Sequence, residues 1–574
     1  MSEADEDDRR SGRARRFLRL TLGFWQGPTR TRAWLLTFLV ISFLLANLGS
    51  ALAVNFWTKY FFDALERRDT DHVLLGIGLI AAIALASAAG SVGLLQARMR
   101  LQVRWRQWLS RALISRWLTN RHFYQLTIIQ TAADNPEARI ADDARIAIEL
   151  MVDFSLGLIN ALLAAASFIG ILWVVGGSLT VMGFAIPGYM VIACVIYSAI
   201  TTLGMYLLAR PLVRRVEQKA AAEAQLRYGL TRVKDNADSI ALVGGDDDER
   251  VRLDVTISEL VERWLGVIVW QGRMMWVNGA NLVLAPVIPL LLGTPNYLSG
   301  EMTLGSLIQA ATAFAQVQLA LNWLADNAMR VADWLAASHR VTQLTDAMDR
   351  LEERLGPAGL GTTIQLGTSP DDCIILRDIN IALHDGDLRL DCAEIVITPG
   401  EKVLVEGGPG SGKSTLIRAV AGLWPWGRGE ILLPAGAETV FMPQRPYFPI
   451  GSLRVSLLYP HQDHEITDDA ICDVLLRCGL EHLIPSLETT EHWSSHLSSG
   501  EQQRLSFARV LIRPPAILIM DEPTSSLDEL SQFRLMEYMR DMLPSTTVIH
   551  AGHRAGLDRF HDRQIGLVWN AICR

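Results

Sequence analysis

The chain has 574 residues, of which 50% are apolar and only 20% are charged, and its mean hydropathy is +0.22. This length predicts more than one domain, and the composition excludes a disordered chain and argues against an ordinary soluble enzyme, which carries more charge. The net charge of −8 lacks the basic excess that neutralises phosphates, so nucleic acid is not an expected partner.

The termini and the cysteines exclude two further classes of protein. The six cysteines, at positions 194, 373, 392, 472, 478 and 573, form no C-x-x-C pair, so neither a disulfide framework nor a zinc site is predicted. Residues 1–32 are first acidic and then basic, and the apolar run after them is too long for a secretory signal peptide. We expect this segment to lie in the cytosol.

Apolar stretches in the first half are long enough to cross a membrane as helices. Residues 33–57, 73–95 and 302–325 are free of charge. Residues 154–209 are also uncharged and contain a break at Gly176-Gly177-Ser178, which predicts two helices joined by a very short turn. Residues 264–292 hold Arg273 and two prolines and form the fifth predicted span. The sequence therefore predicts a polytopic membrane domain of six helices, residues 33–345.

The arginines predict the orientation of these spans. Seven arginines and no acids lie between Arg98 and Arg121, and eight arginines precede the first span, whereas the opposite loops hold only Lys59, Arg67 and Arg68. The positive-inside rule then places both termini and the long loops 97–153 and 210–263 in the cytosol.

Polar side chains recur on one face of the sixth span, and two interpretations of them stay open. They are Gln309, Thr312 and Gln316, continued by Asn322, Asp326 and Arg330. They form hydrogen bonds between helices, or they line a wet cavity that admits a hydrophilic solute. In the second case Arg273 is the intramembrane charge of interest. Otherwise it is an arginine at the cytosolic end that snorkels, or the fifth span has a different register from the one assumed.

The second half changes to short strands and helices after the glycine-rich stretch LGPAGLGTT, so we expect a linker at 346–365 and an α/β domain at 366–574. Here a strand-like KVLVEG leads into a P-loop, in which backbone N–H groups face phosphates and a lysine reaches the β and γ oxygens. Its residues are Gly407, Gly408, Pro409, Gly410, Ser411, Gly412, Lys413, Ser414 and Thr415.

A second motif supplies carboxylates. The buried strand AILIMDE ends in Asp521, which is suited to the Mg²⁺ shell together with Ser414, and in Glu522, which is suited to polarising the attacking water. LSSGEQQR stands just upstream, SSLD follows at 525–528, and His553 comes late in the chain. This order of motifs resembles that of the ATP-binding cassette (ABC) ATPases.

The resemblance implies roles for further residues. Gln444 is similar to the Q-loop glutamine that approaches Mg²⁺, and His553 to the switch histidine at the γ-phosphate. Ser498, Ser499, Gly500 and Asp528 would contact the nucleotide held by the P-loop of a second cassette. One chain holds one set of motifs, so the expectation is a homodimeric half-transporter with a type IV exporter fold and with ATP and Mg²⁺ as cofactors. Ser499 and Glu501 depart from the broad pattern, and only His384 stands where an adenine-stacking aromatic is usual.

A narrower resemblance covers nearly the whole chain. GLWPWGRGEI, FMPQRPYFPIGSLRVSLLYP and NPEARIADD are similar to motifs of the D subfamily, which includes peroxisomal fatty-acyl transporters and a lysosomal cobalamin transporter. NFWTKYFFDALERRD resembles the first hairpin of BacA/SbmA-type importers, which suggests their cassette-bearing, YddA-like relatives in the bacterial inner membrane.

Three functions are compatible with these resemblances. The first is ATP-driven uptake of peptides, including antimicrobial peptides, or of cobalamin. The second changes the cargo to fatty acyl chains, acyl-CoA or lipid. The third is a membrane-bound regulatory ATPase without transport, which the intact set of Lys413, Asp521, Glu522 and His553 disfavours.

Overall fold

The computed structural model describes residues 16–128, 135–181, 184–355, 363–383, 386–408, 410–461, 466–554 and 556–571. The chain divides into two compact units, one drawn from Met1–His122 and Ile129–Asp349 and the other from Phe123–Ile128 and Arg350–Arg574. Helix α12 (Ala328–Leu355) runs past this division, so the first part of the expected linker 346–365 is helical.

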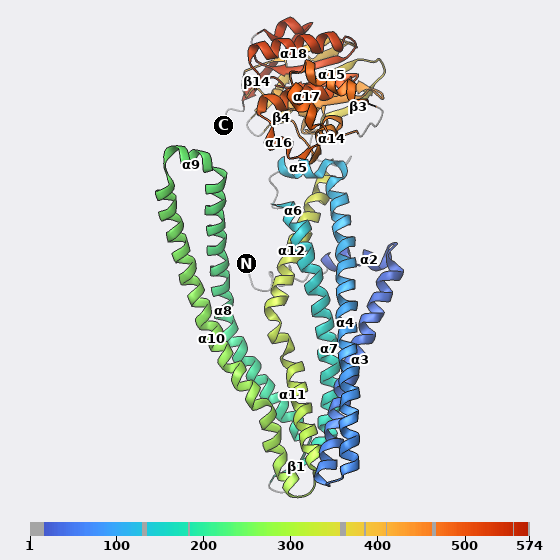
Figure 1. Cartoon of the computed structure of the whole chain (residues 1–574), viewed down its shortest axis with the longest axis vertical. Coiled ribbons are helices and arrows are strands. Elements are labelled where there is room, and N and C mark those ends of the chain that lie inside the picture. The colour runs from blue at the N-terminus through green and yellow to red at the C-terminus, as the bar shows by residue number, and fades with distance from the viewer. Residues whose placement is uncertain are drawn as a thin grey trace. The chain divides into compact units, whose positions relative to one another are not determined.

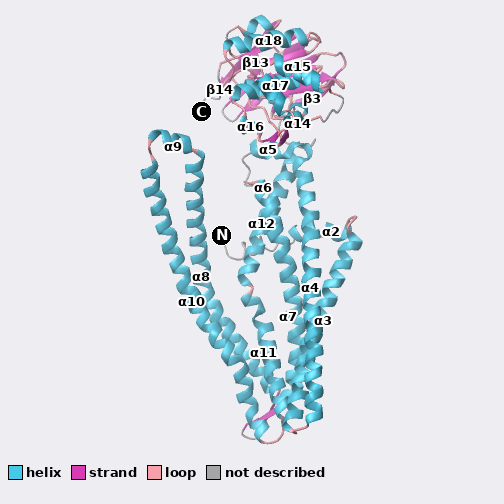
Figure 2. Ribbon diagram, viewed as in Figure 1, coloured by secondary structure: helices cyan, strands magenta, loops and turns pink. Residues whose placement is uncertain are grey.

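The first unit is almost entirely helical (Figure 2). Its elements, with α5 at the division, are α2 (Gly23–Gln26), α3 (Arg30–Glu66), α4 (Thr70–Leu118), η1 (Thr119–Arg121), α5 (His122–Ile128), α6 (Pro136–Ala138), η2 (Arg139–Asp143), α7 (Ala144–Gly176), β1 (Ser178–Val181), β2 (Phe184–Pro187), α8 (Tyr189–Asp235), α9 (Ala237–Val243), α10 (Asp246–Leu298), α11 (Leu304–Asp326) and α12.

Six helices in the described part of the chain are long and apolar enough to cross a membrane, which confirms the expected number. They are α3, α4, α7, α8, α10 and the helix that begins with α11. Most extend well beyond their apolar runs, and α8 and α10 lie side by side with α9 at the tip of their hairpin (Figure 1). The loops 97–153 and 210–263 are therefore largely extensions of the spans.

The connection between the third and fourth spans differs from the expected very short turn. Helix α7 ends at Gly176, as the glycine pair indicated, but β1 and β2 then pair as an antiparallel hairpin before α8 begins at Tyr189. Gly177 and Gly188 both have positive φ, which lets the chain leave one helix and enter the next around a two-stranded ribbon.

The core of this unit lies where α7, α8 and α11 meet. Phe168, Met190 and Phe314 are fully buried there and belong to one apolar cluster. Polar residues of the sixth span join this packing, because Gln309 donates to Asn55 Oδ1 at 3.1 Å and Asn55 donates to Thr312 at 2.7 Å. For these residues the structure supports the interpretation as hydrogen bonds between helices.

The remaining polar residues of the fifth and sixth spans behave differently from one another. Asn322 accepts a hydrogen bond from Thr202 at 2.9 Å, whereas Gln316 is exposed. Arg273 is also exposed, and its guanidinium lies 4.4 Å from the centre of the Trp270 ring. Arg273 therefore makes a cation–π contact on its own helix.

The second unit is an α/β domain. Its strands are β3 (Gln365–Ser369), β4 (Ile374–Leu383), β5 (Gly386–Leu390), β6 (Glu394–Ile397), β7 (Lys402–Glu406), β8 (Gly427–Pro434), β9 (Thr439–Met442), β10 (Gly451–Ser452), β11 (Thr490–Glu491), β12 (Ile517–Asp521), β13 (Thr547–Gly552) and β14 (Arg563–Ala571). Its helices are α13 (Lys413–Val420), α14 (Leu453–Leu458), α15 (Asp468–Arg477), η3 (Glu481–Ser486), α16 (Trp493–His496), α17 (Ser499–Ile512), α18 (Glu529–Met542) and η4 (Leu557–Phe560).

The main sheet has the order β3-β8-β4-β5-β14-β7-β13-β12-β9, with β6 paired to β4. Strands β7, β13, β12 and β9 are parallel, and β7, β12 and β13 are almost wholly buried, as their runs of Val, Ile and Leu indicate. Because the carboxyl ends of parallel strands lie at one edge of a sheet, β7, β9, β12 and β13 bring the segments after them together.

Candidate ATPase site

The P-loop connects β7 to α13, as the sequence predicted. Gly412 caps the helix with φ +90°, a conformation that favours glycine, and a Cβ at this position would lie 2.8 Å from a methyl group of Leu388 and displace it. Ser414 and Thr415 occupy the first turn of α13. The predicted site residue Pro409 and the candidate His384 lie outside the described residues.

Lys413 is the buried cation of this loop. Its side chain is 5% exposed, and its ammonium donates to the carbonyls of Gly407 at 2.7 Å and Gly408 at 3.1 Å. The loop thus folds around its own lysine, which holds the ammonium where the backbone N–H groups of a P-loop face phosphate.

Asp521 ends β12 beside the first turn of α13. Ser414 donates to Asp521 Oδ1 at 2.9 Å. Burial raises the pKa of Asp521, and this hydrogen bond opposes the shift. A hydroxyl and a carboxylate in contact are the hard oxygen donors that Mg²⁺ prefers, so the donor set suits that ion.

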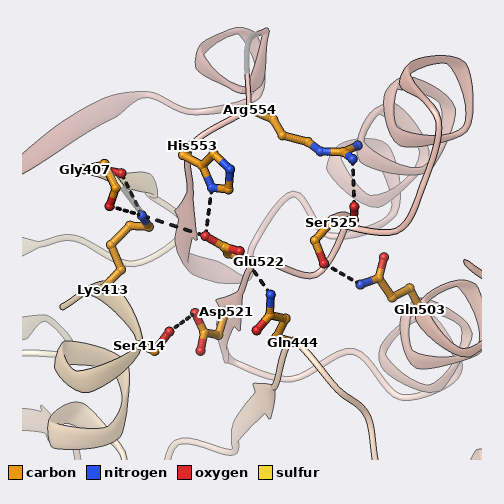
Figure 3. Close-up of polar contacts among 11 residues, drawn as sticks. Gly407, Lys413, Ser414, Gln444, Gln503, Asp521, Glu522, Ser525, His553 and Arg554 are labelled. Atoms are coloured by element: carbon orange, nitrogen blue, oxygen red, sulfur yellow. Dashed lines mark hydrogen bonds and ion pairs between the residues drawn. The ribbon is translucent and has the colours of Figure 1, made fainter. Parts of the chain in front are cut away.

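Glu522 stands at the centre of the site (Figure 3). Its φ of +44° is unusual for a residue with a side chain, and its N–H donates to Ala551 O on β13 at 2.9 Å. One carboxylate oxygen lies 2.8 Å from Nδ1 of His553 and 3.8 Å from the Lys413 ammonium, and the other accepts from Gln444 at 3.2 Å. Residues from four separate segments therefore meet at one carboxylate.

The signature residues lie apart from this cluster. Ser498 caps α17 in a reciprocal capping box, in which its hydroxyl accepts from Glu501 N–H at 3.4 Å and its own N–H donates to the Glu501 carboxylate at 2.9 Å. Asp528 caps α18 by accepting from Ser531 N–H at 2.6 Å. Ser499 and Gly500 form the first turn of α17. Within the described residues, no hydrogen bond joins these four to the P-loop.

Two functional candidates were not predicted from the sequence. Gln503, 3% exposed, donates to Ser525 Oγ at 2.9 Å and accepts from Ser526 N–H at 2.9 Å. Arg554 donates to the carbonyls of Ser525 at 2.7 Å and Leu527 at 2.6 Å. Figure 3 shows both side chains reaching the loop after Glu522 from opposite sides.

These contacts connect α17, the loop between β12 and α18, and the segment that contains His553 in one network of hydrogen bonds. The sequence places Gln503 and Arg554 beside motif residues but gives no signal for the tertiary contacts between them. Arg554 follows His553 directly in the chain, so a shift of His553 would also move Arg554 and the loop at Ser525 that Arg554 contacts.

Comparisons with known proteins agree with this geometry. Residues 25–289 match the family "ABC transporter transmembrane region 2", and residues 390–525 match "ABC transporter". An ABC transporter ATP-binding protein of Haemophilus influenzae is 30% identical, over 95% of this chain and 90% of its own. The inner membrane ABC transporter ATP-binding protein YddA of Escherichia coli is 27% identical, over 94% and 95%.

Two further proteins mark the breadth of the likeness. The human lysosomal cobalamin transporter ABCD4 is 26% identical, over 80% of this chain and 79% of its own. A bacterial Atm1-family ABC exporter with ATP bound has the same fold, with a TM-score of 0.67, 16% identity and 92% of each chain covered. The chain therefore belongs to the ABC transporters, as a half-transporter of the D-subfamily type with six membrane-spanning helices and one ATP-binding domain.

Proposed function

We propose that two copies of this chain form an ATP-driven transporter. The support is the division of labour seen in one copy: the P-loop, Asp521, Glu522 and His553 gather at one place, while the signature residues cap a helix elsewhere. Each copy then supplies the signature surface for its partner's nucleotide, and the dimer holds two composite sites.

Within each site the residues divide the chemistry of hydrolysis. Lys413 exchanges its carbonyl partners for phosphate oxygens, and Ser414, Asp521 and Gln444 would hold Mg²⁺, which neutralises charge on the phosphates. Glu522 accepts the proton of the attacking water, and His553 orients that carboxylate and faces the γ-phosphate.

The single observation that carries this function is the three-sided environment of Glu522. His553, Gln444 and Lys413 surround it with donors, an arrangement that serves a catalytic carboxylate. A regulatory ATPase without transport has no need of such an intact set, and this argues against that alternative.

The cargo we propose is hydrophilic: a peptide, including antimicrobial peptides, or cobalamin, taken up across the bacterial inner membrane with the ATP-binding domain in the cytoplasm. The cobalamin transporter among the relatives supports this choice.

A second candidate, transport of fatty acyl chains, acyl-CoA or lipid, is favoured by one cavity. About 770 Å³ lie between α8, α10 and α11, lined mainly by apolar side chains such as Leu203, Met274 and Leu321. Tyr206 belongs to this lining and carries the guanidinium of Arg210, 4.6 Å from its ring centre. An acyl chain with an acidic head group would suit such a cavity.

The test is uptake of labelled cobalamin and of a labelled proline-rich antimicrobial peptide into bacteria that lack their own importers. We expect the wild type to accumulate a label and Glu522→Gln to accumulate none. If neither label enters while acyl-CoA stimulates the ATPase of the purified protein, the acyl alternative replaces the proposal.

A further inference from the structure

A second cavity of the membrane unit has the opposite character. About 430 Å³ lie between α3, α4 and α7, which run side by side in Figure 1. Five of the lining residues are polar or charged: Asn47 from α3, Ser91 and Arg98 from α4, and Asp153 and Asn160 from α7. Three different helices therefore direct hydrogen-bonding groups to one space.

The contacts between α3 and α4 place this cavity at membrane depth. Asn47 lies 14 residues from the beginning and 10 from the end of the uncharged run 33–57, which is near its middle. Ser91 donates to Asn47 Oδ1 at 3.0 Å, so it lies at the same level. Arg98 follows two helical turns later, roughly 10 Å further toward the cytosolic side at ~1.5 Å per residue.

The polar groups of the cavity have more hydrogen-bonding capacity than their mutual contacts use. Arg98 lies 3.4 Å from Asp153, which also accepts from Gln102 at 2.8 Å. Arg98 Nε is buried and has no hydrogen-bond partner within the described residues. Asn160 is exposed, and no hydrogen bond to its side chain occurs in the described part of the chain.

Contacts between helices alone do not explain this arrangement. A polar residue that only joins helices is paired, as Asn55 is with Gln309 and Thr312. An amide that faces hydrocarbon and a buried guanidinium N–H without a partner would each cost free energy, so these groups need water or a polar ligand.

We propose that this cavity is a binding subsite for the transported solute and takes an amide-bearing group with one anionic end. The inference rests on the proposed uptake of a hydrophilic cargo and narrows its chemistry. Asn47, Ser91 and Asn160 pair with amides, because each offers a donor and an acceptor. Arg98 binds the carboxylate or phosphate, for which its fork of donors is suited, and Asp153 holds that fork in place.

Two sources share this chemistry, a peptide with a free carboxylate and cobalamin with its side-chain amides and phosphodiester. The test uses the full-length protein in lipid nanodiscs without nucleotide. Four probes are compared in equilibrium binding: a labelled alanine tripeptide, the same peptide with a C-terminal amide, cyanocobalamin, and palmitate, which has a carboxylate and an acyl chain but no amide.

We expect Asn160→Leu to weaken binding of the tripeptide or of cyanocobalamin about tenfold, as loss of a buried hydrogen bond does. Arg98→Gln should abolish the preference for the free carboxylate over the amide, and Arg98→Lys should restore part of it. Asn278→Leu is the matched control, because Asn278 is an exposed asparagine on α10 outside the cavity. If a variant elutes as an aggregate in size-exclusion chromatography, Ser91→Ala, a smaller change in the same cavity, is tested in its place.

The outcomes separate this inference from the proposed function. If the wild type transports a hydrophilic label but the cavity variants bind like Asn278→Leu, the subsite is wrong and the function stands. If the wild type binds palmitate alone, both fail. If the uptake assay shows no transport while the cavity variants still lose affinity for the hydrophilic probes, the subsite stands and the transport proposal fails.

Discussion

Replacing Glu522 by glutamine is the sharpest perturbation that the site offers. The amide has nearly the shape of the carboxylate, so it can keep a hydrogen bond to His553 at 2.8 Å and remain beside Gln444. It cannot accept a proton from water. A general base contributes roughly 10²- to 10⁴-fold to a rate, which corresponds to ~3–5.5 kcal/mol of the barrier.

We therefore expect the ATPase turnover of purified Glu522→Gln to fall at least about a hundredfold, while ATP affinity changes by less than about threefold because Lys413 and Ser414 remain. Steady-state phosphate release and equilibrium ATP binding measure the two quantities. Glu529→Gln is the control, because it is the same chemical change at the first residue of α18, outside the cluster around Glu522. Retention of a tenth of the wild-type turnover would refute the assignment of the base.

Three further perturbations test other parts of the structure. Arg554→Met should lower ATPase turnover about tenfold with little change in KM, and Arg554→Lys should recover part of it; an equal loss of ATP binding would contradict its role in positioning the loop after Glu522. Burial lowers the pKa of His550 to about 3, so the unfolded chain takes up a proton below pH 6.5 that the folded domain excludes. Through this group the free energy of unfolding should fall on acidification from pH 6.5 by at most about 1.4 kcal/mol per pH unit. His550→Leu should make the slope in thermal unfolding shallower, while His561, whose pKa burial also lowers, still contributes to it. Asp143→Asn breaks the paired hydrogen bonds of 2.8 and 2.6 Å to Arg340 and should cost about 1 kcal/mol, read as a lower unfolding midpoint than that of Asp142→Asn.

The fold could be predicted from the sequence wherever one local property decides it. Long uncharged runs must be helices in a membrane, so the six spans were predictable. The hairpin of β1 and β2 was not, because a glycine pair marks the end of α7 but does not determine the conformation of the next residues. The motif NPEARIADD gave only a resemblance to a family. In the structure Asp143, its last residue, pairs with Arg340 of α12, almost two hundred residues away.

The candidate site likewise has residues that the sequence predicts and residues that it does not. Residues Lys413, Asp521 and Glu522 were recognisable because a strand and the adjoining loop or helix place them locally. The roles of Gln503 and Arg554 could not be predicted from any sequence spacing, because the two residues are connected only through the loop at Ser525. Pairing between distant segments is a property of the packed sheet, and one sequence without its relatives carries no direct signal of it.

The two membrane cavities make opposite demands on a cargo, and the contacts of their arginines can be compared. In the apolar cavity Tyr206 already engages Arg210, through a hydrogen bond of 2.5 Å and a cation–π contact. In the polar cavity Arg98 keeps a buried N–H without a partner among the described residues. An acidic head group would compete with Tyr206 at the first arginine and with the Asp153 carboxylate, 3.4 Å away, at the second. The arginines alone therefore do not separate the two cargoes, but the five polar or charged side chains of the second cavity suit a hydrophilic, amide-bearing cargo better than an acyl chain.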